Sequence, residues 1–323
     1  MVQIKILFLL LCLFLSTPAR AQSGYSQDYA TWLAGLEQEA VANGVSSRTV
    51  HAALDNVMLD DHVIELDHRQ PERTISFARY ARLVVTAARV REGRSLYREN
   101  AAELKSIARQ FGVQPQVIVA LWAIESGFGR HMGDYKVVDS LATLAYEGRR
   151  AAFFRGELMA ALHILDQEKI SSDSLRGSWA GAMGQCQFMP TTYLKYAYDQ
   201  DKDGKRDIWD NESDVWASIA SYLSAEGWSD TQTWGREVKL TKKISGKMIG
   251  LDHRASLGKW SSLGVRSLGG KPLPATKLQA SLVIPDGQRG RAFLVYDNFR
   301  ALMRWNHSTY FATTVGLLAD RIK

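Results

Sequence analysis

The spacing of apolar residues in the first half of the chain most limits how it can fold. From Tyr29 to about Leu165, apolar residues recur at three- and four-residue steps, as in YATWLAGLEQEAV and FARYARLVVTAARV. This period is typical of helices with one buried face, and Gly44, Gly93 and Gly112 lie near expected helix ends. We therefore expect this half to be almost entirely helical.

The rest of the chain alternates between two textures. Helical spacing returns at about 190–198 and 214–227, on either side of an acidic loop. Between about 236 and 297 the chain is rich in Gly, Ser and Lys with short β-branched runs such as ASLVIP, which predict a small sheet. The end, STYFATTVGLLADRI, is again helical, with Ser308 or Thr309 as N-cap. The expected class is mainly α, within α+β.

Residues 1–21 are typical of a cleavable secretory signal. Lys5 precedes the apolar run 6–15, and an Ala-Arg-Ala end follows. The run is too short to span a bilayer. Cys12 follows Leu11, where a lipoprotein signal needs a small residue. We expect an exported, periplasmic protein that is not a lipoprotein.

Composition restricts the classes of partner. A hydrophobic content of 46% supports a buried core. Loss of Lys5 and Arg20 with the signal leaves 38 basic and 34 acidic residues, so the formal charge falls from +6 to +4. This mild basicity is compatible with an anionic polymer. Basic residues are spread along the chain without a zinc or helix-turn-helix pattern, which argues against nucleic acid.

Cys186 is the cysteine that remains after cleavage, so an internal disulfide is excluded. A leftover thiol is either a nucleophile or a small filler residue. No second catalytic-looking motif surrounds it, which favours the filler interpretation.

The segment ALWAIESGFGRHMG places one acid, Glu125, at an expected helix end. A helix from Pro115 puts Glu125 on the same apolar side as Trp122. Gly127 and the glycine two residues later end that helix, so the carboxyl lies near the negative end of the helix dipole. Both surroundings raise the pKa of a carboxyl, as a general acid requires. The alternative is a Glu that only reaches a backbone donor or Arg130.

A second segment, GSWAGAMGQCQFMPTTY, predicts a glycine-rich loop before a helix that starts at a proline. Ser178 and Gln187 can hydrogen-bond a sugar, while Met183, Phe188 and Met189 can form apolar walls. The alternative is that the glycines serve only tight packing.

The acidic loop DQDKDGKRDIWDNESD matches the start of a calcium-binding EF-hand loop. Asp199, Asp201 and Asp203 alternate before a turn-forming glycine, and Lys205 stands where a backbone carbonyl binds the ion. Position twelve is Asp210, whose arm is shorter than that of the usual Glu, and Asp214 is the rival for that place. We predict bound Ca²⁺; the alternative is a solvated acidic turn.

These motifs together resemble the B-type lytic murein transglycosylases. The resemblance rests on ALWAIESGFGR, AGAMGQCQFMPTTYLKYAYDQDKDGKRDIW, YEGRRAAFF, RWNHSTYFATTV and RQPERT, and it runs from about Tyr29 to the C-terminus. It implies a helical part at about 22–110, a lysozyme-like core at 111–230 that includes the loop 199–214, and a β subdomain at 236–297. Residues 298–323 would then return to the core.

The resemblance implies that peptidoglycan strands are the partner and substrate. The bond between N-acetylmuramic acid and N-acetylglucosamine is broken without water, which leaves a 1,6-anhydromuramyl end. Glu125 is then the single catalytic acid and base, and cell-wall machinery proteins are possible further partners. The implied calcium ligands are Asp199, Asp201, Asp203, the Lys205 carbonyl and Asp214.

The resemblance also implies a glycan cleft. Its implied lining residues are Ser178, Gln187, Tyr222, Trp305, Asn306, Phe311 and Tyr80. Trp305 and Phe311 stand where relatives often have tyrosines, so stacking is kept there and hydroxyl hydrogen bonds are lost.

One carboxylate suffices if the substrate supplies its own nucleophile, whereas an ordinary glycosidase needs two. We interpret the nearby Asp134 and Asp139 as structural. Two alternatives remain: a hydrolytic muramidase, and a non-catalytic peptidoglycan-binding protein, which would not need an acid in this setting.

Overall fold

The computed structural model describes residues 22–69, 75–147, 149–287 and 290–323. The expected signal at 1–21 and most of the RQPERT segment lie outside these ranges. None of the helices among the described residues combines the length and apolarity that a membrane crossing requires.

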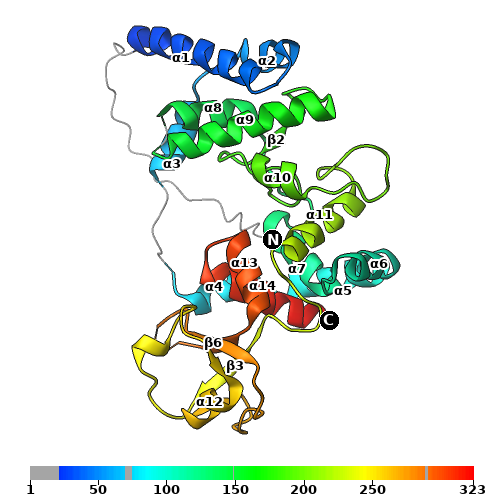
Figure 1. The fold of residues 1–323 in the computed structure, drawn as a ribbon, viewed down its shortest axis with the longest axis vertical. Coiled ribbons are helices and arrows are strands. Elements are labelled where there is room, and N and C mark those ends of the chain that lie inside the picture. Colours follow the sequence, from blue (N-terminus) through cyan, green and yellow to red (C-terminus); the bar gives the residue numbers. More distant parts are fainter. Residues whose placement is uncertain (1–21, 70–74, 148, 288–289) are drawn as a thin grey trace.

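Helices dominate the chain, as the apolar spacing predicts (Figure 1). They are α1 (Gln22–Ala42), α2 (Ser47–Leu54), α3 (Asp61–His68), α4 (Phe77–Val84), α5 (Ala87–Glu99), α6 (Ala101–Phe111), α7 (Pro115–Ser126), α8 (Val137–Glu147), α9 (Ala151–Glu168), α10 (Pro190–Tyr196), α11 (Glu212–Ala225), α12 (Leu257–Ser262), α13 (Asp297–Trp305) and α14 (Thr309–Ile322), with a 3-10 turn, η1 (Gly246–Met248).

In the described ranges, the strands form two antiparallel sheets. They are β1 (Tyr135–Lys136), β2 (Arg176–Gly177), β3 (Gly235–Leu240), β4 (Ala255–Ser256), β5 (Val265–Ser267), β6 (Gln279–Val283) and β7 (Ala292–Val295). β1 pairs with β2, and the larger sheet has the order β4-β6-β7-β3-β5. Trp260 of α12 packs with Leu282 and Leu294 in a core separate from that of the helices.

Helix α7 lies at the centre of the helical core, where it packs against α5, α6, α11 and α14. Every residue from Val117 to Ala123 is buried. Trp122 and Glu125 lie on one apolar side of α7, as expected, but neighbours also cover the other sides of this helix. A helix with no polar face is typical of the centre of a large core.

A second helical layer forms from segments far apart in the sequence. α8 and α9 pack as a pair, α3 lies on α8, and α1 and α2 reach the same layer through the contact of α2 with α9 (Figure 1). α10 contacts both α9 and α11, so it joins this layer to the central helices.

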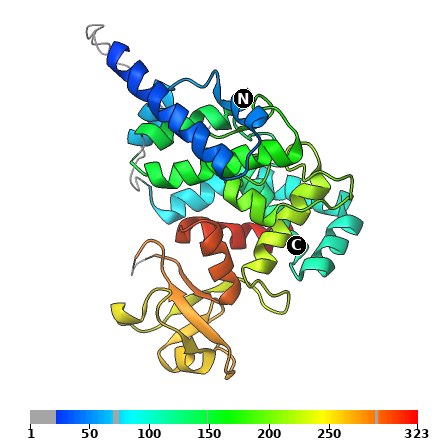
Figure 2. The same cartoon turned by 45° about the horizontal axis from the view of Figure 1, so that its top comes forward.

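The C-terminal helices lie between the larger sheet and the central helices in both views (Figures 1 and 2). α13 follows β7 directly, and α14 packs on α4, α5 and α7. This return brings the end of α13 beside the end of α7. The expected mainly helical class with a small sheet is confirmed.

Candidate active site

Glu125 lies in the last turn of α7. Pro115 occupies the first turn, where its missing N–H is harmless, and Gly127 caps the other end with φ 61°. Phe128 and Gly129 also have positive φ, 61° and 83°, so the chain turns sharply away. The helix thus ends where its glycines predict an end, with the Glu125 side chain only partly exposed.

The surroundings of Glu125 favour a carboxyl that gains and loses a proton near neutrality. Burial raises the pKa of Glu125 to about 7, and a hydrogen bond from the Trp305 indole opposes that rise. The indole Nε1 donates to Glu125 Oε1 at 2.6 Å. Within the described residues, no second carboxylate and no cation is among the groups that set this pKa.

Arg130 does not hold Glu125. Its Nη2 donates to Glu92 Oε2 at 3.0 Å, and its Nη1 donates to the other oxygen of the same carboxylate. This two-point pairing with Glu92 removes the alternative that Glu125 serves only as a partner for Arg130.

Asp134 and Asp139 have their own surroundings. The Asp134 backbone carbonyl accepts from Arg176 at 2.9 Å. Burial raises the pKa of Asp139, and Lys136 lowers it. Neither carboxyl is among the groups that act on Glu125.

Three aromatic rings form a cluster next to Glu125, and we call Phe188, Tyr222 and Trp305 the aromatic cluster. The Trp305 ring centroid lies 4.7 Å from that of Tyr222 and 5.3 Å from that of Phe188. The three rings come from the loop before α10, from α11 and from the end of α13. Phe188 and Tyr222 are buried and Trp305 is partly exposed, so Trp305 is the ring of this cluster that can offer a face to a sugar.

Tyr80 of α4 lies within electrostatic reach of Glu125. Burial raises the pKa of the Tyr80 hydroxyl, and the negative charge of Glu125 raises it further. The ring centroid of Tyr80 is 5.8 Å from that of Tyr310 at the start of α14. Two segments about 230 residues apart thus meet near the acid.

Ser178 and Gln187 are half-buried and help to hold their own loop. Ser178 Oγ accepts from the Ala182 amide at 3.0 Å, which closes a turn. Gln187 Nε2 donates to the carbonyls of Met132 and Gly184 at 3.0 and 2.9 Å. Both side chains thus serve the packing of the loop, whatever further bonds they make with a ligand.

The remaining predicted cleft residues differ in exposure. Asn306, which follows α13, is exposed, and its amide N–H donates to the carbonyl of Leu302 at 3.0 Å. Phe311 is only 6% exposed and belongs to the helical core. Cys186 is buried, and its thiol donates to the Val215 carbonyl at 3.5 Å, as a filler residue would.

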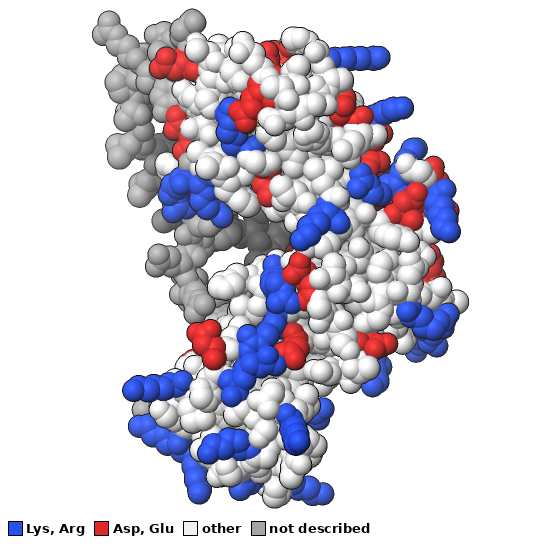
Figure 3. Space-filling model, in the orientation of Figure 1, with Lys and Arg blue, Asp and Glu red and all other residues white. Residues whose placement is uncertain are grey.

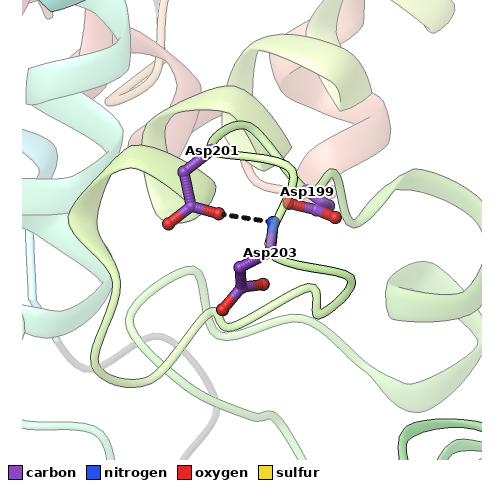
Figure 4. Close-up of side chains that lie close together, drawn as sticks. All are labelled: Asp199, Asp201 and Asp203. Carbon is purple, nitrogen blue, oxygen red and sulfur yellow. Dashed lines mark hydrogen bonds between the residues drawn. The ribbon is translucent and has the colours of Figure 1, made fainter.

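The acidic loop gathers three carboxylates (Figure 4). Asp199, Asp201 and Asp203 each place one oxygen within 4.8 Å of the others. Asp201 Oδ1 accepts from the Asp203 amide at 3.2 Å, and Asp199 Oδ2 accepts from the Gly204 amide at 2.9 Å. Gly204 has φ 89°, a conformation that glycine adopts without strain and that permits the turn.

The donors in this loop suit a hard cation. Asp199 Oδ1 is buried and has no partner within the described chain. Calcium prefers several carboxylate and carbonyl oxygens in this arrangement, and unneutralised carboxylates at this separation repel one another. The three aspartates therefore fit Ca²⁺.

The other predicted ligands are placed less directly. Asp214 is fully buried, and its oxygens accept from the amides of Gln200 and Asp207 at 2.7 and 2.8 Å. It ties the start of the loop to its middle. Lys205 is bonded through its amide to Asp203 Oδ1 at 2.8 Å, and Asp210 is exposed.

Gln185 joins the loop to the end of α7, and the sequence analysis missed it. Its Oε1 accepts from the Trp122 indole at 2.6 Å, and its Nε2 donates to the Trp209 carbonyl at 2.7 Å. Gly129 packs directly on this amide, since an added Cβ there would lie 2.5 Å from Gln185 Oε1. The signal in the sequence that could have pointed to Gln185 is a polar residue within a glycine-rich segment.

Comparison with known proteins agrees with this geometry. The family profile described as Transglycosylase SLT domain matches residues 28–320. Membrane-bound lytic murein transglycosylase B of Escherichia coli strain K12 is 30% identical over 291 residues, which cover 87% of this chain and 79% of that protein.

Solved structures are similar over most of the chain. SltB3 from Pseudomonas aeruginosa, in complex with NAG-anhNAM-pentapeptide, is 43% identical with a TM-score of 0.87, and the match covers 91% of this chain and 79% of that one. The Escherichia coli lytic transglycosylase Slt35 in complex with calcium is 29% identical with a TM-score of 0.78, over 90% and 92% of the two chains.

Proposed function

The chain belongs to the transglycosylase SLT domain family, and on that premise we propose that Glu125 is the acid with which it cleaves peptidoglycan. The chain is a peptidoglycan lytic transglycosylase. It breaks the β-1,4 bond between N-acetylmuramic acid and N-acetylglucosamine without water and leaves a 1,6-anhydromuramyl end. The observation that carries the assignment of Glu125 is its partly exposed carboxyl, whose pKa burial raises to about 7 and which has no carboxylate partner among the described residues.

Protonated Glu125 donates its proton to the glycosidic oxygen as the bond from that oxygen to muramyl C1 breaks. The carboxylate that results then takes the proton from muramyl O6 as O6 attacks C1. Proton transfers thus balance, and Glu125 returns to its protonated form. A pKa near the working pH suits a group that must act first as acid and then as base.

The attack of O6 is intramolecular, so ring positioning replaces a bound water. Well-oriented intramolecular reactions reach effective molarities of about 10⁵ M or more, against about 55 M for water. This advantage favours the anhydro product over hydrolysis if the cleft holds the muramyl ring.

Trp305 is suited to both proton transfers. Its indole N–H donates at 2.6 Å to Glu125, and this bond strengthens when the carboxyl becomes charged. It therefore stabilises the carboxylate formed after the glycosidic oxygen takes the proton. A phenylalanine at this position could stack on a sugar but could not donate a hydrogen bond to Glu125.

We propose that the cleft residues named from the resemblance bind the glycan. Trp305 and Tyr80, which are partly exposed, are suited to sugar faces, with the buried Tyr222 and Phe188 supporting Trp305 from within. Ser178, Gln187 and Asn306 are suited to hydroxyls and amides. Phe311 would contribute through the core beneath the cleft, since its ring is buried.

We propose that the acidic loop holds a structural Ca²⁺ through Asp199, Asp201 and Asp203. The Lys205 carbonyl and either Asp214 or Asp210 would complete the set. The calcium complex of Slt35, 29% identical to this chain, supports this assignment. The ion would neutralise the loop and does not enter the reaction.

We propose export to the periplasm through residues 1–21, without a lipid anchor. A substrate in the cell wall supports this location, as does the pattern of a basic residue, an apolar run and an Ala-Arg-Ala end.

Digestion of purified sacculi by wild-type protein and by Glu125→Gln tests the assignment. We expect anhydromuropeptides from the wild type, lighter by one water than hydrolysis products. General acid catalysis contributes about 10²-fold or more, so the variant should lose at least that factor while its circular dichroism is unchanged. Residual activity within about tenfold would reject Glu125 as the acid, and hydrated products from the wild type would indicate a muramidase.

A further inference from the structure

Charge is divided unequally between the larger sheet and the rest of the chain. Residues 235–291 hold 12 Lys and Arg against three Asp and Glu, a formal charge of +9. The remainder holds 28 against 31, a formal charge of −3. Basic residues are spread along the whole chain, but outside this region acidic residues slightly outnumber them, so the net positive charge of the protein resides in the sheet region.

The basic side chains of this region are exposed to solvent. Figure 3 shows Lys and Arg over its lower part, with acidic residues only near its upper border. Seven exposed lysines have no ion-pair partner within the described chain, whereas Arg254 pairs with Asp297 and Arg291 with Glu237. They are Lys239, Lys242, Lys243, Lys247, Lys259, Lys271 and Lys277.

The few acids of the region do not neutralise these lysines. Glu237 is bound to Arg291. Asp286 accepts from the amides of Phe77 and Ala78, at 2.5 and 3.1 Å, and from the Tyr310 hydroxyl at 3.0 Å. The Asp286 carboxylate therefore caps the start of α4. Asp252, the third acid of the region, is exposed and forms no ion pair with these lysines within the described chain.

A pocket of about 380 Å³ opens among these lysines. Its apolar lining includes Ile244, Ile249 and Ile284, and Lys242 and Lys243 stand at its border. An apolar floor beside two unpaired ammonium groups suits a ligand that carries small alkyl groups and carboxylates together. Peptides that end in a free carboxylate have this chemistry.

We propose that this surface is a second, non-catalytic binding site for the acidic stem peptides of peptidoglycan. We call it the lysine surface: Lys242, Lys243, Lys247 and the adjoining pocket. The proposal rests on the proposed function, because it takes peptidoglycan as the substrate. The lysine surface would hold the enzyme on the wall while Glu125 acts on a strand in the cleft. Unpaired exposed charges of one sign attract an oppositely charged polymer and raise its local concentration.

The test uses Lys242→Gln/Lys243→Gln/Lys247→Gln in the Glu125→Gln background, so that sacculi are bound without being cut. The matched control is Arg91→Gln/Lys105→Gln/Arg109→Gln, which removes the same charge from exposed side chains of α5 and α6. Co-sedimentation with intact sacculi is measured over a range of NaCl concentrations.

We expect the lysine variant to bind intact sacculi about tenfold more weakly at low salt, with a shallower salt dependence, since exposed charges act through a screened field. The control variant should bind within about twofold of its parent, since scattered charges contribute little. On sacculi stripped of stem peptides by an amidase, lysine variant and parent should bind alike.

Equal binding of parent and lysine variant to intact sacculi would overturn the proposal. So would an equal loss on stripped sacculi, which would indicate the glycan, or a loss seen only on phosphatidylglycerol vesicles, which would indicate a membrane. Because binding is measured without cleavage, a failure of Glu125 as the acid leaves this result intact. Cleavage of a short peptide-free glycan by the lysine triple variant with Glu125 retained should match wild type.

Discussion

Two carboxylate sites of this protein differ in what surrounds them. Glu125 stands alone at the end of a buried helix, and burial raises its pKa to about 7. Asp199, Asp201 and Asp203 stand together in a loop, the last two exposed, with oxygens within 4.8 Å of one another. The same functional group is prepared for a proton in the first case and for a cation in the second.

The difference shows that the chemistry of a carboxylate site depends on how many carboxylates it holds and on how far water reaches them. A lone carboxyl among apolar groups lowers its free energy by keeping a proton. A cluster cannot relieve its mutual repulsion in this way without losing its ligand charge, so a divalent cation is the better partner. Gln185 connects the two sites through Trp122 and Trp209.

The largest expected effect concerns the cluster of Asp199, Asp201 and Asp203. Removal of calcium with a chelator should lower Tm, because a ligand at about 100 times its Kd stabilises by about 2.7 kcal/mol. For a chain of this size we expect a fall of roughly 5 °C. Differential scanning calorimetry with and without chelator measures it.

Asp201→Asn/Asp203→Asn should melt near the chelated value even when calcium is present. Asp230→Asn, an exposed aspartate outside the loop, serves as the control and should keep the calcium response. An unchanged melt after chelation, with no calcium found in the protein, would remove the metal site.

The next effect tests the lone carboxyl. The pKa of Glu125 is 4.5 when unfolded and about 7 when folded, so below pH 4.5 both states hold the proton and its ionisation contributes nothing to stability. Between pH 4.5 and 7 only the unfolded state ionises, so the folded state is increasingly disfavoured. Above pH 7 this penalty is constant.

Glu125→Gln removes the penalty and keeps an acceptor for the Trp305 indole. We expect it to raise the free energy of unfolding by an amount on the order of 2 kcal/mol at pH 8 and by little near pH 4.5. Urea unfolding at both pH values provides the comparison. A destabilised variant at pH 8, or a gain that is the same at both pH values, would contradict an apolar setting for this acid.

The smallest effect sharpens the role of the indole. Trp305→Phe removes the donor that lowers the pKa of Glu125, so this pKa should rise by about one unit or less. Because Glu125 must be protonated before substrate binds, the Trp305→Phe variant should stay active to higher pH than the wild type. The basic limb of the kcat/KM profile should move upward accordingly.

Tyr222→Phe is the control for Trp305→Phe, because it changes another ring of the aromatic cluster without touching the donor to Glu125. It should leave the position of the basic limb unchanged, whatever it does to the height of the profile. A limb that stays fixed or moves to lower pH in Trp305→Phe would show that the indole does not favour the carboxylate.

Local patterns predicted much of the fold and part of the site. The mainly helical class is confirmed, and the end of α7 falls at the glycines after Glu125, because chain conformation there depends on residues adjacent in sequence. The regular spacing of Asp199, Asp201 and Asp203 predicted that they would gather for the same reason. The domain limits and the role of each cleft residue stay predictions.

Other features escaped because they depend on distant residues. The all-round burial of α7 comes from α14 and α11, which the spacing within α7 does not reveal. The resemblance implies stacking for Trp305, yet its indole donates to Glu125 from a position 180 residues away.

By itself the sequence determined which acid ends a helix and which aspartates alternate around a turn. Those features are covalent neighbours, so short-range geometry and simple counting suffice. The tertiary structure alone decided that Glu125 meets an indole instead of Arg130, and that seven lysines have no ion-pair partner in the part of the chain that the structure describes. Solvation and pairing energies depend on which surfaces meet, and only the packed chain specifies that.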